Sequence, residues 1–382
     1  MSTMKTSKFQ LECGFCGWQT APSATYRCPS CNGALEARYD LEAATIHASD
    51  VPEMKYFDLL PVVHRESIAS GTSVTTPTRP AEKLGTRIGV PRLWIKDESQ
   101  QPTGSTKDRL AACLLAVFAE LGVTHFVSSS TGNTARALAR AVNMTPKMSA
   151  DFFCARGFEG AVLPYVSDRS RLTVTEGTYA QASSIAQAFA IDNGLTWDGG
   201  FFNWARREGL KVGYLEAFDQ MPADPDVVVQ AISSGMGMMA ARKASKELQA
   251  LGRMNGLPRL LMVQQRSCAP MAKGWGDGRN ALTPEDVIAD PSGIATAILL
   301  GDATPYYPYM HDIARESRGS IVDVSEDDLR DAQRMLREYE GVDVCFSSAA
   351  TLAAVRQERE QGRISAGDTV LLTLTGAAGS HG

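Results

Sequence analysis

Short strand-like runs alternate with helix-like segments along most of this 382-residue sequence, and this alternation constrains the fold more than any other feature. Apolar and β-branched runs indicate strands, whereas longer segments with apolar residues every three or four positions indicate helices. The predicted strands are residues 92–98, 124–130, 226–232, 259–264 and 368–375. The predicted helices are residues 107–122, 132–142, about 178–193, 236–250 and 326–340. This order favours an α/β fold with mainly parallel sheets.

The composition restricts the class of partner. Hydrophobic residues make up 44% of the chain, so a large core can form. The formal net charge is -5 and no Lys/Arg-rich run is present, which argues against nucleic acid or an anionic membrane as a partner. No apolar run reaches the roughly 20 residues that span a bilayer, and residues 1–14 lack a signal-peptide core. We therefore expect a cytoplasmic protein that acts on a small molecule.

Four cysteines near the start follow a C-x2-C-x11-C-x2-C pattern. They are Cys13, Cys16, Cys28 and Cys31. Two such knuckles present four thiolates to one tetrahedral ion, and thiolates prefer zinc or iron over hard cations. Four protein ligands leave no open position, so the predicted Zn²⁺ is structural. The alternatives are a degenerate ribbon without metal, or four unrelated thiols. Only Arg27 and Arg38 are cationic within residues 12–38, which argues against nucleic-acid binding.

Residues 102–109, PTGSTKDR, follow a predicted strand and open a predicted helix. The positive end of the helix dipole disfavours the protonated form of Lys107. A neutral amine is the form that attacks an aldehyde, so Lys107 is a candidate for covalent catalysis. The alternative is that Ser105 or Thr106 caps the helix and Lys107 is an ordinary surface lysine.

Three further turns occur where predicted parallel strands end, which is the edge of an α/β sheet that binds ligands. Residues 128–135, SSSTGNTA, offer backbone N–H groups and hydroxyls that suit a carboxylate. Residues 233–238, SSGMGM, allow backbone amides to approach a phosphate closely. Thr375 precedes Gly376 at the end of the last strand, where its hydroxyl could meet a ring nitrogen. Each turn could equally be a capped helix or an ordinary strand end.

In this order, the four elements resemble the fold-type-II pyridoxal 5'-phosphate (PLP) enzymes of the tryptophan synthase β superfamily. The motif PTGSTKDR, preceded in the sequence by a four-cysteine ribbon, is similar to that of the threonine synthase family, as are residues 75–85 and 340–355. Residues 205–219 and 230–237 also resemble cysteate synthases. The resemblance implies two open, mainly parallel α/β domains and an N-terminal zinc ribbon. The implied domains are a ribbon at 1–40, a large PLP-binding domain at 41–108 with 213–382, and a small domain at 109–212.

The same resemblance implies a role for each site residue. Lys107 would form the Schiff base and move protons, Asn133 would bind the phenolic oxygen of the cofactor, and Thr375 would meet its pyridine nitrogen. The residues implied for the substrate carboxylate are Ser130, Thr131, Gly132 and Thr134. The residues implied for the cofactor phosphate are Ser234, Gly235, Met236, Gly237 and Met238. Apart from the resemblance, a second, substrate phosphate would need its own donors. Lys96, Arg109 and Arg136 are the candidates, and each could equally be a surface charge.

The implied activity is that of a PLP-dependent lyase or synthase. Its substrate would be an amino acid with a β- or γ-leaving group, by resemblance an O-phosphohomoserine-type compound that releases phosphate. The segment after Gly376 lacks the His-Gly-Leu-Lys-Asp-like run of threonine synthases, so other reactions stay open. These are β-replacement of the cysteate or cysteine synthase type, a serine or threonine dehydratase, and a non-catalytic zinc-ribbon binding protein. A homodimer is a possible assembly.

Overall fold

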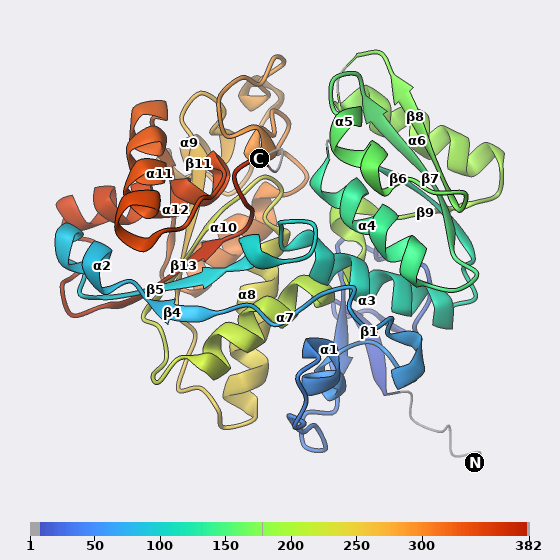
Figure 1. The fold of residues 1–382 in the computed structure, drawn as a ribbon, viewed down its shortest axis with the longest axis horizontal. Coiled ribbons are helices and arrows are strands. Elements are labelled where there is room, and N and C mark those ends of the chain that lie inside the picture. Colours follow the sequence, from blue (N-terminus) through green and yellow to red (C-terminus); the bar gives the residue numbers. More distant parts are fainter. Residues whose placement is uncertain (1–7, 131, 178, 380–382) are drawn as a thin grey trace. The chain divides into compact units, whose positions relative to one another are not determined.

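The computed structural model describes residues 8–130, 132–177 and 179–379 (Figure 1). The chain forms two compact units. The first unit comprises Met1–Thr75 and Lys107–Val212, and the second comprises Thr76–Thr106 and Gly213–Gly382. The three-part division into domains that the resemblance implies stays a prediction.

The first unit begins with a small antiparallel sheet whose strand order is β2-β1-β3. Its strands are β1 (Phe9–Cys13), β2 (Gln19–Thr20) and β3 (Leu35–Tyr39). Phe9 and Leu11 alternate with more exposed residues along β1, so the sheet buries one face. Three short helical turns follow: α1 (Pro52–Lys55), η1 (Phe57–Leu59) and η2 (Arg65–Ser67).

The rest of the first unit is a four-stranded, fully parallel sheet with the order β8-β7-β6-β9. Its strands are β6 (His125–Ser129), β7 (Ser149–Ala155), β8 (Ser170–Thr175) and β9 (Thr196–Trp197). Its helical elements are α3 (Lys107–Glu120), α4 (Asn133–Met144), α5 (Glu159–Val162), η4 (Leu163–Tyr165), α6 (Tyr179–Asp192), η5 (Gly200–Phe202) and the first part of α7 (Trp204–Gln220).

The second unit contains a six-stranded sheet with the order β12-β11-β10-β13-β5-β4. Its strands are β4 (Thr78–Pro80), β5 (Arg92–Asp97), β10 (Val227–Ala231), β11 (Arg259–Gln265), β12 (Ser320–Val324) and β13 (Thr369–Leu374). All neighbours are parallel except β4, which pairs antiparallel with β5 at the edge. Every residue of β10 and β13 is buried, as expected for central parallel strands that helices cover on both faces.

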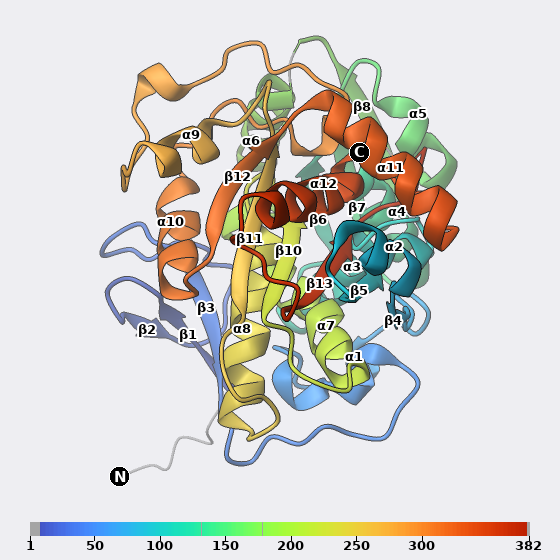
Figure 2. The same cartoon turned by 90° about the vertical axis from the view of Figure 1, so that its left-hand side faces the viewer.

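Helices surround the six-stranded sheet of the second unit. They are α2 (Glu82–Ile88), η3 (Glu98–Gln100), α8 (Met236–Ala250), α9 (Pro270–Gly276), η6 (Pro284–Asp286), η7 (Thr296–Ile298), α10 (Tyr307–Glu316), α11 (Glu326–Glu340) and α12 (Phe346–Glu360). Figure 2 shows α12 lying in front of the sheet, where it packs on β10, β11, β12 and β13. Leu336 of α11 and Leu352 of α12 join Val229 and Leu372 of the strands in one buried core.

The predicted α/β fold with mainly parallel sheets is confirmed. Each strand and helix predicted from the sequence starts and ends within two residues of its expected bounds. The pattern allows no detailed prediction for the segments 143–176 and 265–323, which hold β7, β8, α9, α10 and most of β12. Across the described residues, none of the helices combines the length and the apolar character that crossing a membrane requires.

We expect Gly209→Ala to destabilise the first unit, because α7 and α3 pack backbone to backbone at this position. A Cβ atom on Gly209 would overlap the Arg109 carbonyl oxygen and stand 2.8 Å from the Leu110 Cα. Such overpacking should lower the free energy of unfolding by about 1–3 kcal/mol, measured by urea denaturation. The matched control is Gly160→Ala in α5, where a Cβ meets nothing within 4 Å. Equal stability of the two variants would contradict this packing.

Candidate active site and metal centre

The loop before Lys107 is tied to the end of the last strand of the sheet. Gly104 adopts a φ of +76°, which glycine reaches without strain. The Thr106 N–H donates a hydrogen bond to the Thr375 carbonyl oxygen at 3.0 Å. Ser105 forms an antiparallel bridge with Gly376. These bonds fix the residue that immediately precedes Lys107, and Lys107 is the first residue of α3.

Residues at the start of α12 bind the main chain of Gly376. The Ser348 hydroxyl accepts a hydrogen bond from the Gly376 N–H at 2.9 Å and donates one to the Gly376 carbonyl oxygen at 3.0 Å. The Cys345 N–H also donates to that carbonyl oxygen, at 3.1 Å. Ser348 is fully buried, so this hydroxyl is shielded from competing water. Sequence reasoning missed Ser348, although it lies in the family-like segment 340–355.

The predicted phosphate loop connects β10 to α8 and leaves no space for larger side chains. Gly235 has a φ of +89°, and a Cβ atom there would overlap the Met310 side chain. A Cβ atom on Gly237 would overlap the Gln230 amide. Tyr214 donates a hydrogen bond to Gln230, and burial raises the pKa of Tyr214, so the phenol stays a neutral donor. The backbone of the loop can thus approach a ligand at the positive end of α8.

The Asn loop connects β6 to α4. Gly132 precedes the helix with a φ of +139°, and its N–H donates to the Ser130 hydroxyl at 3.2 Å. Asn133 is the first residue of α4. The nearby residues Ser130 and Thr134 are both buried. Thr131, which the resemblance assigns to the substrate carboxylate, lies outside the described residues.

A buried carboxylate that sequence reasoning missed holds the strand leading into this loop. Asp198 is fully buried and accepts hydrogen bonds from the Ser128 hydroxyl at 2.5 Å and from Arg206 at 2.8 Å. The Gly200 N–H donates to its other oxygen at 3.0 Å. Ser129, which follows Ser128 in β6, has a buried hydroxyl with no hydrogen-bond partner in the part of the chain that the structure describes. Ser129 is therefore an additional candidate for binding a polar ligand.

Lys96 is held inside the second unit by a carboxylate. Its side chain is 1% exposed, and its ammonium group lies 2.5 Å from a carboxylate oxygen of Glu216 and 2.8 Å from the Thr76 carbonyl oxygen. A buried ammonium group requires such partners, because desolvation of an isolated charge is costly. This pairing gives Lys96 a structural role at the end of β5 and argues against its use as a phosphate ligand.

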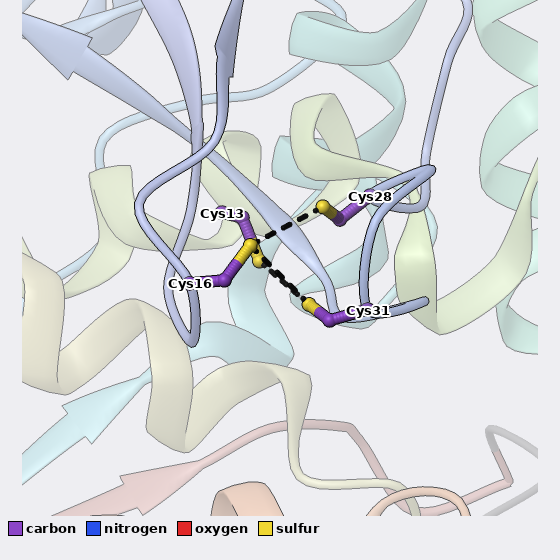
Figure 3. Close-up of side chains that lie close together, drawn as sticks. All are labelled: Cys13, Cys16, Cys28 and Cys31. Atoms are coloured by element: carbon purple, nitrogen blue, oxygen red, sulfur yellow. Dashed lines mark hydrogen bonds between the residues drawn. The ribbon is translucent and has the colours of Figure 1, made fainter.

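The four N-terminal cysteines converge in space. Figure 3 shows their sulfur atoms pointing toward one another from two loops. All four sulfurs lie within 4.8 Å of one another, and the pairs Cys13–Cys31 and Cys16–Cys28 are 3.4 and 3.5 Å apart. Four thiolates at about 2.3 Å from one zinc ion would stand about 3.8 Å apart in a tetrahedron. The geometry therefore fits a four-thiolate metal site.

The cysteine ribbon is anchored to the start of α7 within the first unit. The Tyr39 hydroxyl donates to Glu208 at 2.8 Å, and the Trp204 indole N–H donates to the Thr25 carbonyl oxygen at 3.2 Å. Arg207 donates to the Leu35 carbonyl oxygen. Glu208 is buried and is paired with a lysine one helical turn later in α7. These contacts make the ribbon an integral part of this unit.

Comparison with known proteins identifies relatives over the whole chain. The model of a family described as pyridoxal-phosphate dependent enzymes matches residues 70–376. Threonine synthase of Methanosarcina acetivorans is 28% identical over 380 residues, which cover 96% of this chain and 91% of the relative. Cysteate synthase of Methanocella paludicola is 30% identical over 393 residues, covering 96% and 89%.

Solved structures share the fold at lower identity. Maize serine racemase superposes with a TM-score of 0.66 at 20% identity, over 83% of this chain and 95% of that chain. Threonine deaminase isoform 2 of Solanum lycopersicum gives a TM-score of 0.66 at 18% identity, over 81% and 85%. These likenesses confirm the predicted fold-type-II architecture.

We expect Ser348→Ala to lower the free energy of unfolding by about 1–3 kcal/mol, because it removes both hydrogen bonds to buried Gly376. The matched control is Ser347→Ala, whose buried hydroxyl has no hydrogen-bond partner among the residues described. Chemical denaturation of both variants measures the difference. A loss in Ser347→Ala as large as that in Ser348→Ala would show that the bonds to Gly376 contribute nothing specific.

Proposed function

This chain belongs to the family of pyridoxal-phosphate-dependent enzymes, and we propose that it catalyses elimination or replacement on an amino acid with a β- or γ-leaving group. We propose phosphate as the leaving group and an O-phosphohomoserine-type substrate. The observation that carries the proposal is the bond between Thr106 and Thr375. Thr106 immediately precedes Lys107, and it is bonded to the strand end where the partner of the ring nitrogen is expected.

Each motif contributes one part of the proposed cofactor site. Lys107 attaches the aldehyde of the cofactor, Asn133 hydrogen-bonds its phenolic oxygen, and the Thr375 hydroxyl meets its pyridine nitrogen. The residues proposed for its phosphate are Ser234, Gly235, Met236, Gly237 and Met238. The positive φ of Gly235 and the close packing at Gly237 support this, because the loop exposes backbone rather than side chains.

The bound cofactor supplies an electron sink that acidifies the α-hydrogen of an attached amino acid. The Lys107 amine would remove that hydrogen as a general base. A γ-leaving group requires a second proton removal, at the β-carbon. A neutral hydroxyl at Thr375 would favour an unprotonated ring nitrogen, and the weaker electron sink would suit elimination better than transamination.

The substrate is held by the Asn loop in this proposal. The residues proposed for its carboxylate are Ser130, Thr131, Gly132 and Thr134, with Ser129 as an addition from the structure. Arg109 and Arg136 remain candidates for the leaving phosphate, since both are buried in the first unit. A charge-assisted bond from a guanidinium group suits phosphate geometry.

A second candidate function is β-replacement on O-phosphoserine. The observation that favours it is the similarity to cysteate synthase, at 30% identity over nearly the whole chain. A sulfonate product would require sulfite as the nucleophile. Incubation with O-phospho-L-homoserine or O-phospho-L-serine, each with and without sulfite, distinguishes the two. Threonine as the product supports the first function, and a sulfite-dependent sulfonate supports the second.

We expect Lys107→Ala to abolish phosphate release from the preferred substrate, because both cofactor attachment and proton transfer lose their group. Free phosphate measures turnover, and borohydride followed by peptide mass spectrometry locates the attached cofactor. The control is Lys83→Ala, an exposed lysine of α2. Attachment of the reduced cofactor to another lysine, or phosphate release by Lys107→Ala, would contradict the assignment.

The remaining parts of the proposal concern the metal, the domains and the assembly. We propose that Cys13, Cys16, Cys28 and Cys31 hold one structural Zn²⁺. The division into a ribbon (1–40), a large domain (41–108 with 213–382) and a small domain (109–212) also belongs to the proposal. We also propose that the protein is located in the cytoplasm and forms a homodimer.

We expect about one zinc per chain in protein prepared without chelators, because four converging thiolates form a closed site. Cys31→Ser should lower both the zinc content and the melting temperature, since ribbon folding is coupled to metal binding. Metal analysis and thermal melting are the measurements. Cys268→Ala, which changes a buried cysteine outside the cluster, should keep the zinc. Full folding of wild-type protein without zinc or iron would rule the site out.

A further inference from the structure

A pocket of about 510 Å³ opens in the second unit among α2, α11 and α12. Its volume lies within the range of small-molecule sites, about 300–1,000 Å³. Four guanidinium groups line it. The planar guanidinium group is well suited to binding carboxylates and phosphates. They belong to Arg87, Arg334, Arg356 and Arg359. No part of the proposed catalytic machinery contributes to this lining.

Two of these arginines form no ion pair with any residue that the structure describes. Arg356 is half-buried, and its Nη1 atom is shielded from solvent without a hydrogen-bond partner within the described ranges. Leaving a shielded donor of a charged group unpaired is costly, so a ligand that pairs with it gains affinity. Arg359 donates to the carbonyl oxygens of Gly89 and Ile364 at 3.0 and 3.4 Å. These neutral partners orient the guanidinium group without neutralising its charge.

The rest of the lining supplies carboxylates and apolar surface. Asp331 is paired with Arg334 at 2.9 Å. Glu338 and Glu360 are exposed carboxylates of the same pocket. The apolar side chains of the lining are Ile88, Met335 and Tyr339. The pocket therefore combines groups for an anion, groups for a cation and a surface for an apolar group.

We propose that this pocket binds a free α-amino acid with an apolar side chain. It would be a second amino-acid site, in addition to the proposed substrate site. Arg356 and Arg359 bind its carboxylate, and Glu338 or Glu360 binds its ammonium group. Its side chain packs on the apolar residues of the lining. A simple anion would place a negative charge near the carboxylates of the two glutamates. A zwitterion instead offers a carboxylate to the arginines and an ammonium group to the glutamates.

The pocket and the segment that carries Thr375 share one helix. Ser348, in the first turn of α12, binds Gly376, and Arg356 lies eight residues further along, about 12 Å down the helix axis. The two ends of α12 thus contact two different ligand sites in this proposal. The binding claim itself does not depend on the proposed reaction.

Calorimetry with L-leucine as the probe tests the site in PLP-loaded enzyme treated with borohydride, so that the probe cannot exchange with Lys107. We expect saturable binding at one site per chain. 4-Methylpentanoate lacks the ammonium group and 3-methylbutylamine lacks the carboxylate. Each should bind at least about tenfold more weakly, as expected for the loss of a charged hydrogen bond.

Variants assign the binding to this pocket. Arg356→Met should weaken leucine binding about 10- to 100-fold. Glu360→Gln, at an exposed position, should weaken binding of leucine but not that of 4-methylpentanoate. The control is Arg330→Met on α11, whose guanidinium group pairs with Glu326 outside the pocket. Circular dichroism checks that each variant is folded.

Three results would overturn the proposal. The first is no saturable binding of leucine. The second is equal affinity for leucine and 4-methylpentanoate, which would indicate a plain anion site. The third is unchanged leucine affinity in both folded Arg356→Met and Glu360→Gln, which would place the binding elsewhere.

Discussion

The short main-chain pairing between residues 104–106 and residues 375–377 is the constraint on which the proposed site in this protein depends. It joins a turn that follows β5 to the end of the neighbouring strand β13, so parallel strand pairing in the sheet sets its position. α3 begins one residue later, and the first side chain of that helix is Lys107. The register of β5 and β13 therefore sets the position of Thr106, the residue that immediately precedes Lys107.

Within each unit, buried polar groups hold the turns that are proposed to bind ligands. Ser348 saturates the main chain of Gly376, Asp198 orders the end of β6, and Gln230 fills the space behind Gly237. Lys96 and Glu216 compensate each other at the end of β5. In a water-excluded environment such bonds are stronger than at the surface, and their loss leaves unsatisfied groups. Such bonds restrict the conformations of the turns, and a restricted turn loses less entropy when it binds a ligand.

The sequence was sufficient to predict the alternating elements, the parallel sheets and the place of each motif at a strand end. Those features depend on local periodicity and on glycine and hydroxyl residues in short turns. Ser348 and Asp198 could not be predicted, because each acts on a residue 28 or 70 positions away. The pairing of Lys96 could not be predicted for the same reason. Its partner Glu216 lies 120 positions later, and nothing near Lys96 in the sequence indicates that it is buried. Segments 143–176 and 265–323 mix short helices and strands with loops, so their periodicity is weak.

The bonds that hold the end of β13 use only main-chain atoms of Thr375 and Gly376. The Thr375 side chain consequently takes no part in these anchoring bonds, and the backbone there is indifferent to which side chain it carries. Under the proposed assignment, a single codon could exchange the group that faces the ring nitrogen while the scaffold stays unchanged. This separation of scaffold from chemistry makes residue 375 a suitable starting point for directed evolution toward a different reaction outcome.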